Sequence, residues 1–302
     1  MNSSFRALVL GAAAGGGLPQ WNCGCPNCAE ARRPGGRIPP QTQSSLAVTG
    51  DGVHWAVLNA SPDIRHQIQT NAALHPAGLR HTPISSVLLT NGDIDHLAGL
   101  LVLREKQPFT LFLTSQIAGI IRQNPVFGVL DPAVVNVRIV ELGERFELAP
   151  GLTAELFCVP GKVPLYLEGE TVVSDEEGEQ TVGVQLSQHE TAIYYIPGCA
   201  RLTPALKSRL GNANVLFFDG TVFSDDEMIQ SGTGHKSGRR MGHMPMTGEG
   251  GSLPEFQGVT IKRKIFIHIN NTNPVWRPDS PERAQVNRAG WEIAFDGMDV
   301  SL

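Results

Sequence analysis

Thr90-Asn91-Gly92-Asp93-Ile94-Asp95-His96-Leu97-Ala98-Gly99 is the stretch of the 302-residue chain that decides the fold. It follows an apolar segment, residues 84–90, that is typical of a buried strand. It also has the frame of a metal-binding loop, Thr-His-x-His-x-Asp-His-x-x-Gly. Asn91 and Asp93 stand where the first two histidines of that frame would be, whereas Asp95 and His96 match it. Half of a metal site remains, which predicts that the site has changed its metal.

Two other apolar segments also end in a side chain that can bind a metal. The segment Val215-Leu216-Phe217-Phe218 is followed by Asp219, and residues 264–270 carry His268. Ligands bind at the carboxyl ends of strands in open α/β sheets, and core packing alone does not explain three strands that each end in a potential ligand. We therefore predict one active-site metal bound by two imidazoles and two carboxylates, those of Asp95, His96, Asp219 and His268.

The remaining patterns predict an α/β fold with mixed sheets. A strand is expected over residues 5–11, a hairpin over 45–60 and a helix over 96–105. The first strand runs directly into Gly15-Gly16-Gly17, which favours a buried strand over a signal peptide. Further strands are expected at 109–113, 135–141, 152–159, 181–186, 192–196 and 292–295, and further helices at 115–122, 203–210 and 281–288.

Composition excludes several classes of partner. A hydrophobic content of 41% is ample for a buried core. With 24 Lys+Arg against 29 Asp+Glu, no nucleic-acid partner is expected. No apolar run is long enough to span a bilayer, so no membrane association is expected either.

The cysteines indicate a second metal site. Cys23, Cys25 and Cys28 lie within six residues, which is too close for a disulfide framework and favours a reducing compartment, the cytoplasm. Three thiolates in one loop predict a structural Zn²⁺ that needs a fourth ligand. The alternative is three reduced cysteines in a turn.

The order of these motifs resembles the metallo-β-lactamase superfamily over nearly the whole chain. The cysteine loop, the Thr90–Gly99 stretch, Phe218-Asp219-Gly220-Thr221, Gly242-His243-Met244-Pro245 and His268-Ile269-Asn270-Asn271 are similar to the family of coenzyme PQQ (pyrroloquinoline quinone) biosynthesis protein B. The resemblance implies a single domain over residues 1–302, a four-layer αββα sandwich with two mixed β-sheets.

The resemblance also specifies the metals. The superfamily's first metal site needs three histidines, and Asn91, Asp93 and Lys162 occupy those positions. A lysine ammonium repels a divalent ion, so one cation is expected, bound by the second site. Nitrogen and oxygen donors with open positions suit Fe²⁺, although Zn²⁺ would also bind. In related phosphodiesterases a histidine completes the cysteine site. Asn271 stands at that position, and a carboxylate or water is the alternative ligand.

The function implied by the resemblance is PQQ biosynthesis, through O₂-dependent hydroxylation of the tyrosine ring of a Glu–Tyr-derived precursor. The partners are then O₂ and a small peptide or amino-acid-derived precursor. Asp93, Lys162 and His243 are the expected catalytic residues that handle protons, with Lys162 and Asp93 forming an ion pair. A surface role is the alternative for His243. Residues 236–240 are either a solvated patch or an arginine clamp for substrate carboxylates.

Two other functions remain open. A metal-dependent hydrolase of a phosphodiester or lactone would need two bound ions and a ligand role for Asn91 or Asp93. A non-enzymatic carrier or transport factor would bind PQQ or its precursor without using the metal ligands. The oligomeric state is open, a homodimer included.

Overall fold

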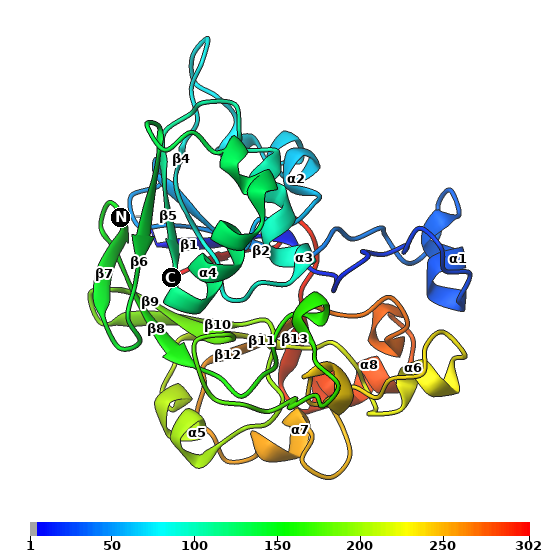
Figure 1. The fold of residues 1–302 in the computed structure, drawn as a ribbon. Helices are drawn as coiled ribbons and strands as arrows, with labels where there is room; N and C mark the ends of the chain where they lie inside the picture. The colour runs from blue at the N-terminus through cyan, green and yellow to red at the C-terminus, as the bar shows by residue number, and fades with distance from the viewer. Residues whose placement is uncertain (1–4) are drawn as a thin grey trace.

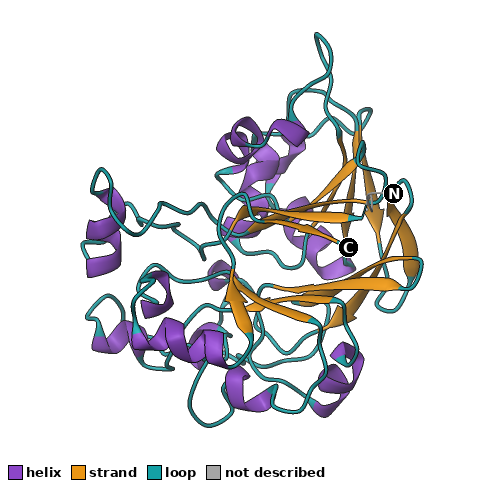
Figure 2. Ribbon diagram, turned by 180° about the vertical axis from the view of Figure 1, so that it is seen from behind, coloured by secondary structure: helices purple, strands orange, loops and turns teal. Residues whose placement is uncertain are grey.

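The computed structural model describes residues 5–302, so residues 1–4 of the expected 1–302 domain lie outside the described residues. Two seven-stranded β-sheets pack face to face, and helices cover the outer face of each sheet (Figures 1 and 2). The predicted αββα sandwich with two mixed sheets is confirmed. None of the described helices is long and apolar enough to cross a membrane.

The first sheet has the order β14-β1-β2-β3-β4-β5-β6. Its antiparallel part contains β14 (Asp299–Ser301), β1 (Arg6–Gly11), β2 (Ser45–Thr49) and β3 (Trp55–Leu58), and its parallel part continues from β3 through β4 (Ile84–Leu88), β5 (Phe109–Leu113) and β6 (Val135–Ile139). The helices on this side are α2 (Ile64–Thr70), α3 (Ile94–Leu97) and α4 (Ser115–Gln123) (Figure 1).

The second sheet has the order β13-β12-β11-β10-β9-β8-β7. Its antiparallel part contains β7 (Arg145–Ala149), β8 (Leu152–Cys158), β9 (Val182–Gln188) and β10 (Thr191–Ile196), and the parallel part runs from β10 through β11 (Val215–Asp219), β12 (Arg263–Ile267) and β13 (Trp291–Ile293). Its helices are α5 (Pro204–Leu210), α6 (Glu227–Gln230), α7 (Ser252–Glu255) and α8 (Pro281–Arg288), whereas α1 (Pro26–Arg32) projects from the sandwich (Figure 1).

Strand β1 shows why the central strands read as continuous apolar runs. Ala7 and Val9 belong to the core between the sheets, whereas Leu8 and Leu10 pack in the core beneath the helices of the first sheet. Because both faces of the strand are buried, side chains that alternate in direction are apolar throughout.

Backbone hydrogen bonds join the two sheets at the end where β4, β11 and β12 finish. The amide of Val182, in β9, donates to the carbonyl of Thr90 at 2.9 Å, and the amide of Ile269 donates to the carbonyl of Ala12 at 3.0 Å. These bonds attach the segment that follows β4 to β9 and the segment that follows β12 to the end of β1, and the predicted metal ligands lie on these segments.

The helix predicted over residues 96–105 is wrong in its extent. Helix α3 ends at Leu97, and the chain continues as a 3₁₀ helix, Ala98–Leu101. At Gly99 the backbone passes so close to the preceding loop that a Cβ would collide with the carbonyl oxygen of Ser61, and the Gly99 amide donates to Ala60 at 2.9 Å. This tertiary contact diverts the chain from the path that its apolar pattern indicates.

Glu227 connects two segments that flank the predicted site. Its Oε1 accepts a hydrogen bond from the Thr272 hydroxyl at 2.6 Å, and its Oε2 accepts one from the Phe223 amide at 2.7 Å. The side chain is buried, and burial raises the pKa of Glu227 to about 7. The carboxyl group thus links α6 to the loop that follows β12.

We expect Glu227→Gln to flatten the pH dependence of stability. The pKa of Glu227 rises from the model-peptide value of 4.5 to about 7 on folding, so the folded state binds the proton more tightly. The resulting stabilisation is complete below pH 4.5 and is lost as the pH rises through about 7. Thermal unfolding across this range should show a smaller decline for the variant than for the wild type. Glu190→Gln, at an exposed position, is the control, and an equal decline in both variants would contradict the assignment.

Candidate metal centre

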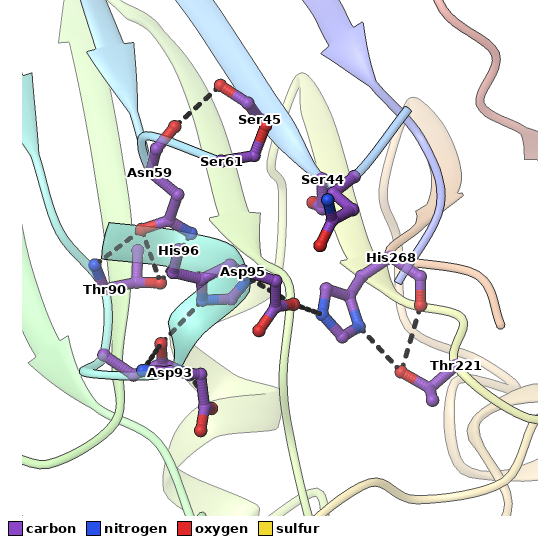
Figure 3. A network of polar contacts seen from close by, with 12 residues as sticks. Ser44, Ser45, Asn59, Ser61, Thr90, Asp93, Asp95, His96, Thr221 and His268 are labelled. Carbon is purple, nitrogen blue, oxygen red and sulfur yellow. Dashed lines mark hydrogen bonds and ion pairs between the residues drawn. The ribbon is translucent and has the colours of Figure 1, made fainter. Parts of the chain in front are cut away.

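Two strand ends bring three potential ligands together. Asp95 and His96 lie on α3, which follows β4, and His268 directly follows β12. One ligand atom from each of the three lies within 4.8 Å of the others, and the Asp95 carboxylate lies between the two imidazoles (Figure 3). Asp95 Oδ2 is 3.1 Å from His268 Nε2 and 3.8 Å from His96 Nε2. We call this group the metal triad.

His96 presents an unused lone pair to the triad. Its Nδ1 lies 2.6 Å from Asn91 Oδ1, a carbonyl oxygen that only accepts, so Nδ1 carries the proton and Nε2 is left as an acceptor. His96 Nε2 is buried without a hydrogen-bond partner among residues 5–302. Burial lowers the pKa of His96 to about 4, which keeps the ring neutral at pH 7. A buried, neutral, unpaired imidazole nitrogen fits a metal ion.

His268 is held with its other nitrogen toward Asp95. Its Nδ1 is 2.9 Å from the Thr221 hydroxyl, which leaves Nε2 facing Asp95 Oδ2 (Figure 3). Burial acts to lower the pKa of His268, but the hydrogen bond and charge of Asp95 raise it above the ordinary value. A cation bound between His268 Nε2 and Asp95 Oδ2 would replace the proton that these two atoms share. The triad thus offers two imidazole nitrogens and a carboxylate oxygen, a donor set that fits a divalent metal.

The structure places Asp219 in a second group that shares His268 with the triad. The ligand atoms of Asp219, His243 and His268 lie within 4.8 Å of one another. Asp219 Oδ2 accepts from the Cys199 amide and lies 2.8 Å from His243 Nδ1, whereas Oδ1 accepts from the Thr221 hydroxyl at 2.7 Å. The four predicted ligands, together with His243, therefore fall into two groups that share His268. His243 is half-buried beside Asp219, and its ring stacks on that of His268 at 5.2 Å.

Asp93 and Lys162 lie near the triad without forming the expected ion pair. The Asn91 amide donates to Asp93 Oδ2 at 2.8 Å. Burial, with a contribution from Asp95, raises the pKa of Asp93 against the opposing effect of Lys162. The Lys162 ammonium pairs with Glu168 at 3.1 Å, so the predicted Lys162–Asp93 pair is wrong. The partner carboxylate comes from a loop whose path the sequence pattern did not predict.

Sequence reasoning missed the residues that orient these ligands. The Asn59 side chain exchanges hydrogen bonds with the amide and hydroxyl of Thr90 at 2.9–3.1 Å (Figure 3). These bonds anchor the start of the Thr90–Gly99 stretch, which we call the motif loop. Thr221 contacts both His268 and Asp219. Thr221 belongs to the Phe218–Thr221 motif, and this motif was the sequence signal from which its role could have been predicted. Asn59 has a positive φ of 63°, and no pattern in the sequence marked it as a residue that orients the site.

The three cysteines of the N-terminal loop also come together. Cys23, Cys25 and Cys28 have their sulfur atoms within 4.8 Å of one another, and the Asn271 amide group lies over them, with Nδ2 at 3.2, 3.6 and 3.3 Å. Burial raises the pKa of Cys28 to about 11, so a cation would be needed to hold this thiol as a thiolate. Asn271 is where the fourth ligand was expected, and turning its amide over would point Oδ1 at the sulfurs. Its role as a ligand stays a prediction.

Comparisons with known proteins agree with this geometry. A family model described as a beta-lactamase superfamily domain matches residues 54–269. A protein named coenzyme PQQ synthesis protein B, from Rhizobium meliloti (strain 1021), is 60% identical over 300 residues, which cover 99% of each chain. A crystal structure of Zn²⁺-bound PqqB from Methylobacterium extorquens has a TM-score of 0.97 at 52% identity and covers 98% of this chain and 100% of that one. A diphosphatase of the PhnP family, with a TM-score of 0.70 at 19% identity over 99% of this chain and 97% of that one, shows the shared fold alone.

Asn91→Ala is expected to weaken metal binding at the triad by about 10- to 100-fold, because His96 loses the acceptor that fixes its protonated nitrogen. The measurement is a Zn²⁺ titration of metal-free protein against a chelator of known affinity. Asn136→Ala, at an exposed position of β6, is the matched control. Equal affinities for the two variants would show that Asn91 does not orient the ligand.

Cys28→Ser is expected to remove one Zn²⁺ per chain and to lower the melting temperature, since three sulfur ligands hold the N-terminal loop against the loop that follows β12. Elemental analysis and thermal unfolding measure the two effects. Cys158→Ser, which changes a cysteine outside the cluster, should leave both unchanged. An undiminished zinc content in Cys28→Ser would leave three reduced thiols as the correct description.

Proposed function

Because the chain belongs to the coenzyme PQQ synthesis protein B family, within the beta-lactamase superfamily, we propose that it acts in PQQ biosynthesis as a mononuclear-iron hydroxylase. Its substrate is the tyrosine ring of a Glu–Tyr-derived precursor, and its second substrate is O₂. The observation that carries the proposal is the metal triad, in which one carboxylate and two imidazoles each place a ligand atom within 4.8 Å of the others.

The donor set supports iron over magnesium and calcium. Two histidines and one carboxylate with open positions are typical of Fe²⁺ sites that react with O₂, whereas magnesium and calcium prefer oxygen donors alone. Asp95, His96 and His268 would hold the ion, and Asp219, with both oxygens already accepting hydrogen bonds, would orient His243 and Thr221. When bound, the ion supplies the redox chemistry that activates O₂.

Protons would be handled by groups of the chain beside the triad. The raised pKa of Asp93 lets this carboxyl group hold a proton nearer to neutral pH, as a general acid or base requires. His243 donates from Nδ1 to Asp219, which fixes the ring and leaves Nε2 for exchange with the substrate phenol. Lys162 supplies a positive charge that favours ionised forms of Asp93 and of the phenol.

The hydrogen bonds of Asn91 and Asp93, which stand where the frame has histidines, argue against the hydrolase. Asn91 Oδ1 is committed to His96, and Asp93 accepts from Asn91, so neither is arranged to bind a second ion. The group formed by Asp219, His243 and His268 is the remaining place for one. A metal count of two at the centre would favour hydrolysis of a phosphodiester or lactone. Tight quinone binding that survives Asp95→Ala and His268→Ala would favour the carrier.

The test is hydroxylation by protein loaded anaerobically with Fe²⁺. On addition of O₂, ascorbate as the electron donor and the Glu–Tyr-derived precursor, we expect O₂ uptake and a gain of one oxygen atom on the tyrosine ring by mass spectrometry. Asp93→Asn should slow the reaction by about 10²- to 10⁴-fold with unchanged iron content, because a general acid or base is lost.

Asp131→Asn, at a position near the surface and far along the chain from the motif loop, should react at the wild-type rate. Fully iron-loaded protein that consumes no O₂ with the precursor would refute the hydroxylase. A full rate in Asp93→Asn would refute only the role of that carboxyl group.

A further inference from the structure

Three cations converge on one carboxylate in the loops beside the metal triad. Glu168 accepts from both terminal nitrogens of Arg240, at 3.1 and 3.4 Å, and lies 3.1 Å from Lys162 Nζ and 3.8 Å from Lys236 Nζ. The Glu168 side chain is only 9% exposed. We call these four residues the Glu168 cluster.

The cluster adjoins the candidate centre through Lys162. The charge of Lys162 acts on Asp93, and a Cβ at Gly242 would lie 3.0 Å from Lys162 Cγ. Gly242 precedes His243, whose ring stacks on His268. The same cation therefore borders the motif loop on one side and Glu168 on the other.

The charges of the cluster do not balance. Three cations face one carboxylate, in a chain whose formal net charge is −5. Farther along the segment that carries Glu168, one cation faces two carboxylates, because Arg201 pairs with both Asp175 and Glu177 at the surface. A carboxylate held by an arginine fork and two ammonium groups is the arrangement that proteins use to recognise an anionic ligand.

The segment that carries Glu168 also presents apolar side chains next to the motif loop. Tyr166 donates its hydroxyl proton to the carbonyl of Gly92, which fixes the segment against the loop that precedes Asp93. Leu165, Tyr166 and Leu167 are 61%, 44% and 45% exposed. An exposed apolar surface beside a surplus of cations suits an aromatic molecule that bears carboxylates.

We propose that Lys162, Lys236 and Arg240 form a binding site for a carboxylate of the substrate, and that Glu168 fills this site as an internal carboxylate until the substrate displaces it. The inference rests on the proposed function for the identity of the substrate. It extends that function by assigning the recognition of the carboxylate, as distinct from the reacting ring, to these residues.

The experiment measures binding without turnover. Zn²⁺-loaded protein is titrated with PQQ, which bears three carboxylates, and with its trimethyl ester. Arg240→Gln should weaken PQQ binding by about tenfold or more, because a charge-assisted bidentate contact is lost. Glu168→Gln should strengthen PQQ binding several-fold, because the internal competitor is neutral. Ester binding should be the same in all variants.

Arg201→Gln is the matched control, since it removes a guanidinium that contacts the same segment through Asp175 and Glu177. If Arg240→Gln is poorly folded by circular dichroism, Arg240→Lys keeps the charge, loses the fork and should still weaken binding. No PQQ binding by wild type and by Glu168→Gln, equal affinities of Arg240→Gln and Arg201→Gln, or weaker binding by Glu168→Gln would each overturn the proposal.

The two proposals fail separately. Binding that depends on Arg240 in a protein that hydroxylates nothing refutes the hydroxylase alone. Hydroxylation by an enzyme whose PQQ affinity ignores Arg240 refutes the carboxylate site alone.

Discussion

The hydrogen bond from His96 Nδ1 to Asn91 Oδ1 is the contact on which the candidate centre depends. It selects the tautomer of a fully buried ring and leaves Nε2 facing Asp95, without a hydrogen bond to any residue in the described part of the chain. The contact exists because β4 delivers both residues in one short loop, which Asn59 anchors at Thr90. An amide where a histidine would ligate thus prepares a neighbouring histidine to ligate instead.

Each position that departs from the histidine frame has acquired a different physical role. Asn91 orients, Asp93 is a carboxyl group of raised pKa, and Lys162 joins a cluster of charges with Glu168. The backbone around them has the fold of the beta-lactamase superfamily, which a diphosphatase shares. The fold sets where side chains meet and the side chains set what they do there, so the fold alone does not determine the chemistry of the site.

Much of this could be predicted from the sequence where a local pattern carries the information. Buried strands such as Phe109–Leu113 and Val215–Asp219 show as apolar runs, and the carboxylate that ends the second of them marks the site. Strand β7, Arg145–Ala149, was missed although its apolar and charged residues alternate as in a half-buried strand. Helix α1 was missed because the cysteine spacing obscures its pattern. The separation of Asp219 from Asp95, and the choice of Glu168 as the partner of Lys162, depend on distances between loops that no pattern within one segment contains.

His268 adopts a left-handed backbone conformation, with φ of 58°, that side chains other than glycine rarely take. Such a conformation costs of order 1–3 kcal/mol and persists only where surrounding contacts enforce it. Here the Thr221 hydroxyl contacts both the carbonyl and the ring of His268. The imidazole direction is consequently built into the main chain and does not wait for an ion to arrive. A cage that is rigid before loading would accept zinc and iron with little difference in shape, so the supply of each metal, together with the ligand types, would decide which ion is bound.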